Sequence, residues 1–285
     1  MPITVKPAKP DYADDAELVQ AELAHLPDQV AGALDDADIR IVACRGSVVD
    51  FDPSLSGERP RNWPEGKTWD SVPGAYLPRH KIVAIATVAK TNGERCVPPF
   101  GQLHGSRSLA VHETLHGYDY SREHHLSKGR AFRAAWSADR ATLGSDYYVN
   151  AASGPEESFA ESGAHQFGLD QSQRSAWPHL EGFWDTHGDG LWSVPLTLDL
   201  APDDDIESLD AESIGRGVRR NDGSFTLFLT AKGPDGEIGH GMVTVAAGDP
   251  GFETLVEVDA QARRKDHQFG MTLHGHAFDV PPFPD

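Results

Sequence analysis

The segment His112–His116 most constrains how this chain can fold, because it reads His-Glu-Thr-Leu-His. Histidines four positions apart lie on one face of an α-helix, so both imidazoles can approach a single metal ion. Neutral imidazole is a common ligand of Zn²⁺, and a neighbouring carboxylate can accept a proton from water. The pattern predicts a helix over residues 106–120, capped by Ser106 or Ser108, with His112 and His116 as zinc ligands and Glu113 as general base.

A second segment, Gly154–Ser162, supplies carboxylates that could complete such a site. Pro155 suits the first turn of a helix, where its missing N–H is not needed. Glu157 and Glu161 are four positions apart and share a face of this predicted helix. One of them could bind the metal while the other accepts the free N–H of a ligating histidine and orients its ring. Alone, the segment would favour an acidic helix start in solvent; together with the upstream histidines it favours a metal site.

The remaining pattern predicts a mixed α+β fold. Residues 1–12 read as a polar tail, and apolar positions over 14–34 fit one or two helices interrupted near Pro27. Residues 39–49 and 82–88 are rich in β-branched residues and predict strands, the second of them apolar on both faces and therefore interior. Further helices are predicted over 128–143 and from Pro155.

The composition changes after Pro195, where an acidic stretch leads into segments that resemble short strands joined by glycine-containing turns. These segments are Phe225–Ala231, Gly241–Ala247 and Thr254–Val258. We therefore predict three parts: an N-terminal tail and helix over residues 1–27, a catalytic domain over 28–196, and a smaller β-rich domain of unassigned role over 197–285.

Charge and composition exclude several classes of partner. The 285 residues carry a net charge of −19, which repels phosphate backbones, so we expect no nucleic acid partner. We also expect no membrane span and no cleavable signal, and therefore either a cytoplasmic protein or one exported by a specialised route. Two cysteines, Cys44 and Cys96, exclude a cysteine-rich zinc finger; they either form one disulfide or remain buried thiols.

Three ordered segments resemble the anthrax lethal factor-like zinc metallopeptidases, a family that includes Pro-Pro endopeptidases. They are RNWPEGKTWDSVPG from Arg61, HETLHGYD from His112 and PEESFAES from Pro155, and the resemblance covers roughly residues 28–188. It implies a zincin-like domain in which His112, His116 and Glu157 bind zinc and Glu113 acts as general base.

The resemblance also implies supporting roles. Glu161 and Asp119 match acids that would contact the metal-binding residues and not the metal itself. Glu156 matches a position that shapes the substrate site. The family's active-site tyrosine falls on Asn150 in an ungapped match. The role therefore passes to Tyr148 through a two-residue insertion, which we favour, or to Tyr147, or is lost.

Two further residues are candidates for contact with a substrate. Trp63, between asparagine and proline, is the better of two nearby tryptophans for a substrate-facing aromatic. His104 resembles the family's loop before the first ligand helix, and we expect it either at the edge of the cleft or hydrogen-bonded within the core.

The sequence thus predicts an α+β protein with a zincin-like catalytic domain followed by a smaller β-rich domain. Its predicted activity is that of a zinc-dependent endopeptidase of the gluzincin type, which hydrolyses a peptide bond in a protein or peptide substrate. The family resemblance suggests a secreted or delivered bacterial toxin or effector. Because the tyrosine position is not matched, the alternative is a zinc-structured module that binds a protein partner with little or no hydrolysis.

Overall fold

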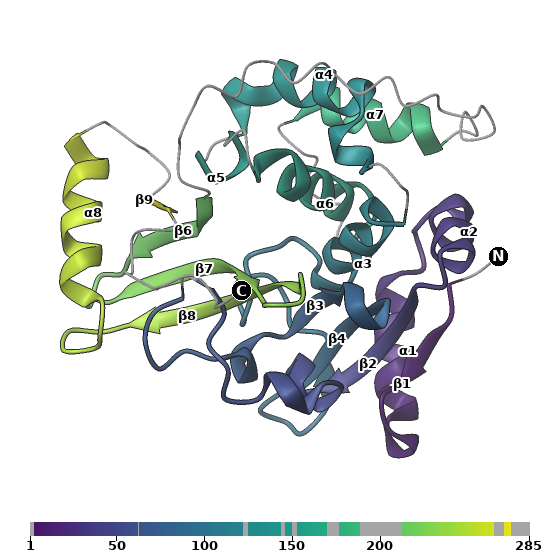
Figure 1. The fold of residues 1–285 in the computed structure, drawn as a ribbon, viewed down its shortest axis with the longest axis horizontal. Helices are drawn as coiled ribbons and strands as arrows, with labels where there is room; N and C mark the ends of the chain where they lie inside the picture. The colour runs from purple at the N-terminus through teal and green to yellow at the C-terminus, as the bar shows by residue number, and fades with distance from the viewer. Residues whose placement is uncertain are drawn as a thin grey trace.

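The structure is a computed structural model that describes residues 3–61, 63–121, 125–143, 146–149, 153–169, 177–188, 213–264 and 271–274. A mixed sheet runs through the centre of these residues, and most of the helices cover one of its faces (Figure 1). The predicted α+β class is confirmed. In the described ranges, no helix is both long enough and apolar enough to cross a lipid bilayer.

The sheet has nine strands in the order β1-β2-β4-β3-β8-β7-β6-β9, with β5 paired to β4 beside this path. Strands β1, β2 and β4 are parallel, and every other pairing is antiparallel. The strands are β1 (Val5–Pro7), β2 (Arg40–Arg45), β3 (Gly74–Leu77), β4 (Ile82–Ala89), β5 (Arg95–Cys96), β6 (Ser213–Arg219), β7 (Phe225–Lys232), β8 (Ile238–Val245) and β9 (Met271–His274).

Strand β4 shows how the two faces of the sheet are divided. Successive side chains of a strand point to opposite faces. Val83 and Ile85 join the apolar cluster beneath the helices, whereas Ala84 and Ala86 join the cluster on the other face. All four are buried, which confirms the prediction of an interior strand. Cys44 on β2 is buried and, like Cys96, is a free thiol.

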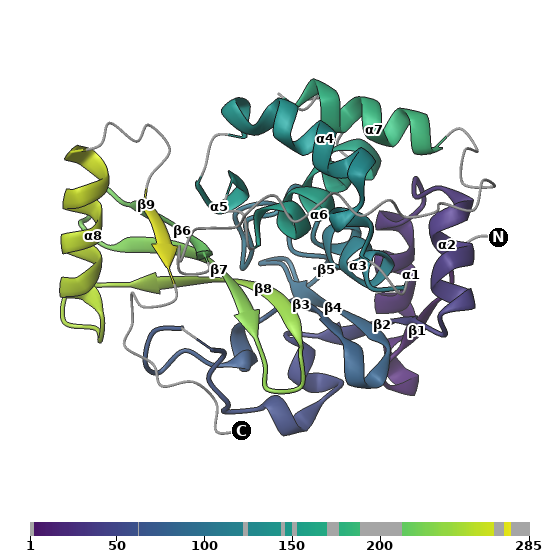
Figure 2. The same cartoon turned by 45° about the horizontal axis from the view of Figure 1, so that its top comes forward.

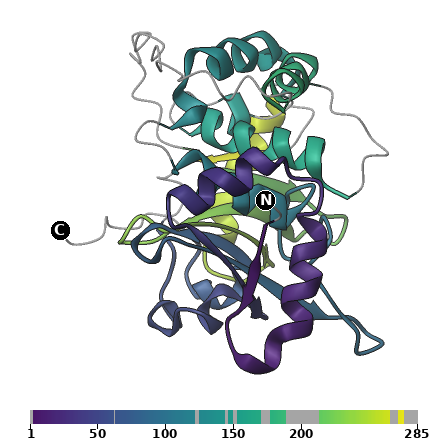
Figure 3. The same ribbon diagram turned by 90° about the vertical axis from the view of Figure 1, so that its right-hand side faces the viewer.

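Apart from α8, the helices lie over one face of the sheet in successive layers. Helix α3 lies against β3 and β4, α6 packs on α3, and α4 and α7 lie beyond α6 (Figure 2). Helices α1 and α2, purple in Figure 3, cover the end of the sheet that is formed by β1 and β2. The helices are α1 (Ala13–Glu22), α2 (Asp28–Asp36), α3 (Leu109–Asp119), α4 (Arg130–Asp139), α5 (Asp146–Val149), α6 (Gly154–Phe167), α7 (Pro178–Gly188) and α8 (Phe252–Arg264). Short 3₁₀ turns occur at Pro10–Tyr12, Val48–Asp50, Pro53–Leu55, Trp69–Ser71, Pro78–His80, Leu126–Lys128 and Arg140–Thr142.

Two predicted elements differ from the structure. The tail over residues 1–12 contains β1, which pairs with β2 because Val5 adds its side chain to the core. Thr254–Val258, predicted as a strand from its valines, lies inside α8. Phe252, Leu255 and Val256 of α8 recur at helical spacing, so one face of α8 packs on the sheet face opposite the other helices.

The strands beyond residue 196 continue the same sheet. Strand β8 pairs with β3, with Gly74 opposite His240, and the two parts share one apolar cluster. The composition pattern predicted a separate β-rich domain over 197–285, but these strands extend the sheet of the preceding part. A change in composition reports the kind of local structure and carries no information on which strands pair.

Candidate metal centre

Helix α3 carries the His-Glu-Thr-Leu-His segment and is buried along its whole length. Ser108 caps it, since its hydroxyl accepts a hydrogen bond from the backbone N–H of Val111 at 3.4 Å. The imidazoles of His112 and His116 lie on one face of the helix, with their Nε2 atoms 3.1 Å apart. The helix thus brings the two predicted ligands to one point.

Helix α6 presents two carboxylates to these imidazoles, and Pro155 occupies its first turn as predicted. Glu157 Oε2 lies 3.6 Å from His112 Nε2 and 3.9 Å from His116 Nε2. One turn later, Glu161 accepts hydrogen bonds from His112 Nδ1 at 3.0 Å and from the backbone N–H of Arg107 at 2.9 Å. Glu157 therefore faces both imidazoles, whereas Glu161 holds the outer side of one ring and leaves its Nε2 for the centre.

A third histidine reaches the centre from strand β8. His240 Nε2 lies 2.9 Å from Glu157 Oε2, and its Nδ1 lies 2.8 Å from Glu113 Oε1. The sequence-based prediction missed this residue, because a single histidine in a strand has no partner at a fixed spacing. The one available indication was the face of the strand: Val243 and Val245 point into the core, so His240 points to the face that carries α3.

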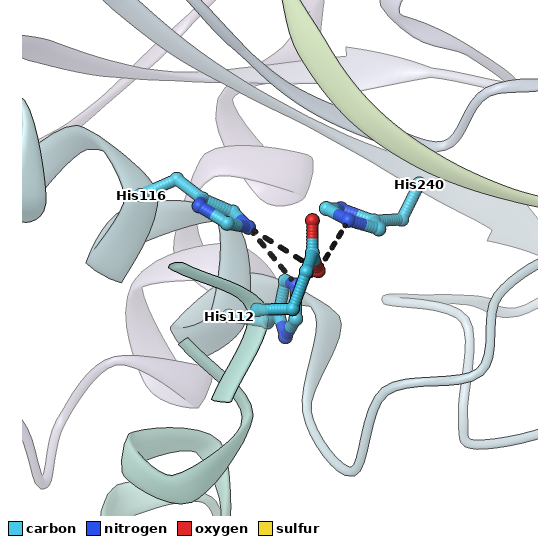
Figure 4. Close-up of side chains that lie close together, drawn as sticks. His112, His116 and His240 are labelled. Carbon is cyan, nitrogen blue, oxygen red and sulfur yellow. Dashed lines mark hydrogen bonds and ion pairs between the residues drawn. The ribbon is translucent and has the colours of Figure 1, made fainter. Parts of the chain in front are cut away.

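Four buried groups thus converge: His112, His116, Glu157 and His240 offer ligand atoms that all lie within 4.8 Å of one another (Figure 4). A tetrahedral Zn²⁺ with bonds of about 2.0–2.1 Å would place its ligand atoms about 3.3–3.4 Å apart. The separations of 2.9 to 3.9 Å at Glu157 and 3.1 Å between the α3 imidazoles bracket this value. Imidazole and carboxylate donors also suit zinc chemically, so the residues fit the ion that the sequence predicts.

The electrostatics of the cluster keep its carboxylates charged and affect its three imidazoles differently. Burial alone would raise the pKa of Glu157, but His240 and His112 hold it well below the ordinary value. Burial also opposes ionisation of Glu161, yet its hydrogen bond with His112 helps to lower its pKa to about 2. Burial lowers the pKa of His116 well below its usual range. At neutral pH the carboxylates are charged and His116 is neutral, as metal ligation requires. Burial opposes protonation of the other two imidazoles, but Glu157 and Glu113 raise the pKa of His240 well above its usual range, and hydrogen bonds with Glu157 and Glu161 raise that of His112. These two imidazoles must therefore release a proton when a metal binds.

A cavity of about 30 Å³ adjoins the cluster. Its lining includes His112, Tyr147, Tyr148, Arg216 and His240. A space of this size holds one or two water molecules.

Comparison with known proteins places the chain in a family. The family model described as "Anthrax toxin lethal factor, N- and C-terminal domain" matches residues 3–176, more than half of the chain. The chain belongs to this family. The resemblance predicted from the three sequence segments is therefore confirmed, and His240 lies beyond the matched residues.

A curated relative and a solved structure that resemble this chain both carry the name Pro-Pro endopeptidase and come from Paenibacillus alvei. The chain is 28% identical to the curated relative over 121 residues, which covers 41% of this chain and 50% of the relative. The match thus spans about half the length of that relative. A solved structure of the Pro-Pro endopeptidase from the same organism is 25% identical, with a TM-score of 0.51, over 65% of this chain and 97% of that one.

The two candidate tyrosines lie on α5, next to the cavity. The Tyr147 hydroxyl is 2.8 Å from Thr230 Oγ1 on β7, and burial followed by the charge of Glu157 raises its pKa well above the ordinary value. The backbone carbonyl of Tyr148 accepts a hydrogen bond from Trp136 Nε1 at 2.8 Å, and its ring lines the same cavity. Both tyrosines are close enough to the centre to stay candidates for the family's active-site role.

The predicted supporting acids lie in two different places. Glu161 contacts His112, whereas Asp119 accepts hydrogen bonds from the backbone N–H and hydroxyl of Ser127, both at 2.7 Å. Among the described residues, His116 Nδ1 has no hydrogen-bond partner. Asp119 and Glu156 instead flank His125, at 3.4 and 3.6 Å from its Nδ1. Asp119 therefore anchors the segment after α3, and Glu156 lies beside that anchor.

The two predicted substrate-contacting residues lie in the core. Trp63 has no exposed surface, and its Nε1 donates a hydrogen bond to the carbonyl of Thr230 at 2.9 Å. His104 is also fully buried; its Nε2 lies 2.7 Å from the Pro98 carbonyl, and its Nδ1 accepts from the backbone N–H of Ser106 at 3.2 Å. The neighbouring proline and asparagine suggested an exposed Trp63, but strand β7 covers it from far along the chain.

Proposed function

We propose that this chain is a zinc-dependent endopeptidase acting on a protein or peptide substrate, with His112, His116 and Glu157 as zinc ligands. The observation that carries the proposal is the approach of Glu157 Oε2 to within 3.6 and 3.9 Å of the two α3 imidazoles, next to the Glu113 carboxylate. Two histidines and a glutamate are the ligand set of several zinc peptidases. The names of the relatives support peptide hydrolysis, and the family description supports a delivered toxin or effector.

Each residue of the centre has a proposed role. Zn²⁺ would polarise the scissile carbonyl and acidify the attacking water. Glu113 Oε2 is buried and, among the described residues, without a hydrogen-bond partner, so this oxygen is available to accept the proton and pass it to the leaving amine. Glu161 orients His112 through Nδ1. A tyrosine hydroxyl, from Tyr148 or Tyr147, would stabilise the oxyanion.

A second candidate function is a zinc-structured binding module that recognises a protein partner. The observation in its favour is His240, which raises the number of protein ligand groups to four. Four protein ligands are typical of structural zinc sites, whereas catalytic sites keep one position open.

The test combines metal analysis with peptide cleavage. Purified protein is expected to contain about one zinc per chain. A peptide library that includes Pro–Pro bonds, the bond named in the relatives, is incubated with wild type and Glu113→Gln. Glu113→Gln should retain zinc and lose cleavage, because the substitution removes the base and leaves the ligands in place. Protein without metal, or cleavage undiminished in Glu113→Gln, would contradict the proposal.

A further inference from the structure

We infer that His240 is a fourth protein ligand of the metal and that strand β8 thereby closes the coordination position that hydrolysis needs. The inference rests on the proposed function for the identity of the metal and of the other three ligands. It assigns to the segment beyond the family match, residues 177–285, the role of holding the centre in a latent state. Three independent features of the structure carry it.

The first feature is the direction of the His240 ring. Its Nε2 points at Glu157 Oε2, 2.9 Å away, which is the oxygen that also faces His112 and His116. The ring is stacked on that of His116, with centroids 5.2 Å apart and planes within 8° (Figure 4). His240 therefore occupies a fourth corner of the ligand set, where a catalytic zinc site would keep water or substrate.

The second feature is the rigidity of the strand that carries the ring. His240 lies between two glycines that are packed too closely for any side chain. A Cβ at Gly239 would lie 2.7 Å from the carbonyl oxygen of Gly74, and one at Gly241 would lie 2.5 Å from the ring of Trp63. The backbone of β8 is thus seated directly on the neighbouring strand and core, which fixes the position of His240 over the centre.

The third feature is access. Strand β3 beside the centre is paired on both edges, with β4 on one side and β8 on the other. An extended peptide therefore cannot bind by adding a strand to β3, a common mode of peptide recognition. His240 Nδ1 also holds Glu113 Oε1 at 2.8 Å, so the proposed base is engaged by the same ring. Strand β8 thus supplies the fourth ligand group, pairs with one edge of β3 and contacts one oxygen of the proposed base.

X-ray absorption spectroscopy of the zinc-loaded wild type counts the imidazole ligands directly. We expect three imidazoles and one carboxylate in the wild type and two imidazoles in His240→Ala. We also expect His240→Ala to bind zinc at least ~10-fold more weakly in a chelator competition. Loss of a residue that only hydrogen-bonds to a metal ligand already costs about that much affinity. Met242→Ala is the matched control: Met242 lies two positions further on the same strand, so it shares the face of His240 without joining the ligand set.

Peptide cleavage tests the closure separately from the ligand assignment. Zinc-loaded His240→Ala should cleave at least ~10-fold faster than wild type, and His240→Ala combined with Glu113→Gln should not cleave. Two imidazoles in the wild-type spectrum would overturn the inference without reference to any variant. Measurable cleavage by wild type that His240→Ala does not exceed would also overturn it. Three imidazoles with no cleavage by any zinc-loaded variant would support the ligand assignment and overturn the peptidase proposal instead.

Discussion

Gly163 of α6 lies so close to Leu115 of α3 that a Cβ at position 163 would be 2.1 Å from Leu115 Cδ1. Helix α3 carries two imidazoles of the centre and α6 carries two carboxylates. The contact between Gly163 and Leu115 therefore sets the distance between the two halves of the ligand set. A glycine is needed here for close approach of the helices.

Replacing Gly163 with alanine should push the helices apart and weaken metal binding. Overpacking of this kind costs about 1–3 kcal/mol of the free energy of unfolding, which outweighs the helix preference of alanine. Gly182→Ala is the control, because Gly182 lies in α7 and, outside its own helix, none of the described residues has an atom within 4 Å of the added Cβ. This variant should gain up to ~1 kcal/mol. Urea unfolding and zinc affinity are measured for both. Wild-type zinc affinity in Gly163→Ala would refute the role given to this contact.

Glu157→Ala should lose zinc more severely than Glu161→Ala. Glu157 faces both α3 imidazoles, whereas Glu161 contacts only the outer nitrogen of His112. Loss of a supporting contact typically costs about 10–100-fold in affinity or activity, and loss of a direct ligand costs more. Dissociation constants from chelator competition decide the order, and the reverse order would exchange the two assignments.

Asp15 of α1 should be the main acid-sensitive link between the N-terminal helix and the sheet. Its buried carboxylate accepts hydrogen bonds from Arg45 Nε at 2.7 Å and Arg95 Nε at 2.6 Å, and from the Thr87 hydroxyl. Burial alone would raise the pKa of Asp15, but the bonds from Thr87, Arg95 and Arg45 hold it below the ordinary aspartate value. The stabilisation is therefore complete above the unfolded-state pKa of about 4 and is lost as pH falls through the lower folded-state pKa.

Asp15→Asn should accordingly lower the free energy of unfolding by about 1–3 kcal/mol at pH 7, because two partly exposed guanidinium groups lose their charged hydrogen-bond acceptor. The difference from wild type should shrink at pH 3. Asp14→Asn, at the exposed neighbouring position, should stay within about 0.5 kcal/mol of wild type at both values of pH. A pH-independent effect of Asp15→Asn would show that packing, and not charge, is responsible.

Tyr148→Phe should lower kcat while leaving zinc content and KM nearly unchanged, if the hydroxyl contacts only the transition state. Loss of one oxyanion donor costs about 10²–10³ in rate in a well-studied protease. Both tyrosine substitutions are made in the His240→Ala variant and compared there. Tyr147→Phe removes a hydroxyl that lies 2.8 Å from Thr230 Oγ1. Full activity in Tyr148→Phe would transfer the role to Tyr147 or remove it from both.

A chain that ends at residue 196 should be poorly soluble and should bind zinc more weakly than the full chain. The composition change suggested that such a chain would fold alone, but it would lack β8, His240 and eight of the 20 buried residues of one apolar cluster. Trp63 and Val72 would lose the backbone of β8 that packs on them at Gly241 and Gly239. Exposed apolar surface of this extent favours aggregation. Sedimentation and metal analysis of the truncated chain test this, and a soluble chain with full zinc affinity would restore the two-domain interpretation.

The sequence predicted those parts of the centre whose residues are joined by short spacing rules. His112, Glu113 and His116 lie on one helix turn, and Pro155 with Glu157 marks the start of another helix. His240 could not be predicted in this way, because its contact with Glu113 spans 127 positions. The buried position of Trp63 could not be predicted for the same reason. Its hydrogen bond to Thr230 spans 167 positions, and its immediate neighbours suggested an exposed loop. Pairings between distant strands depend on tertiary packing, which local patterns do not encode.

The separation of the ligands along the chain gives the centre a mechanical consequence. A metal ion bound to both Glu157 and His240 would join residues that are 83 positions apart in the sequence. Its bond to His116 would close a second, shorter loop between His116 and Glu157. Such an ion acts as a reversible cross-link, comparable to a disulfide, that ties α3, α6 and β8 at a single point. Because long closed loops restrict the unfolded chain most, chelation should both lower the unfolding temperature and accelerate the separation of β8 from β3.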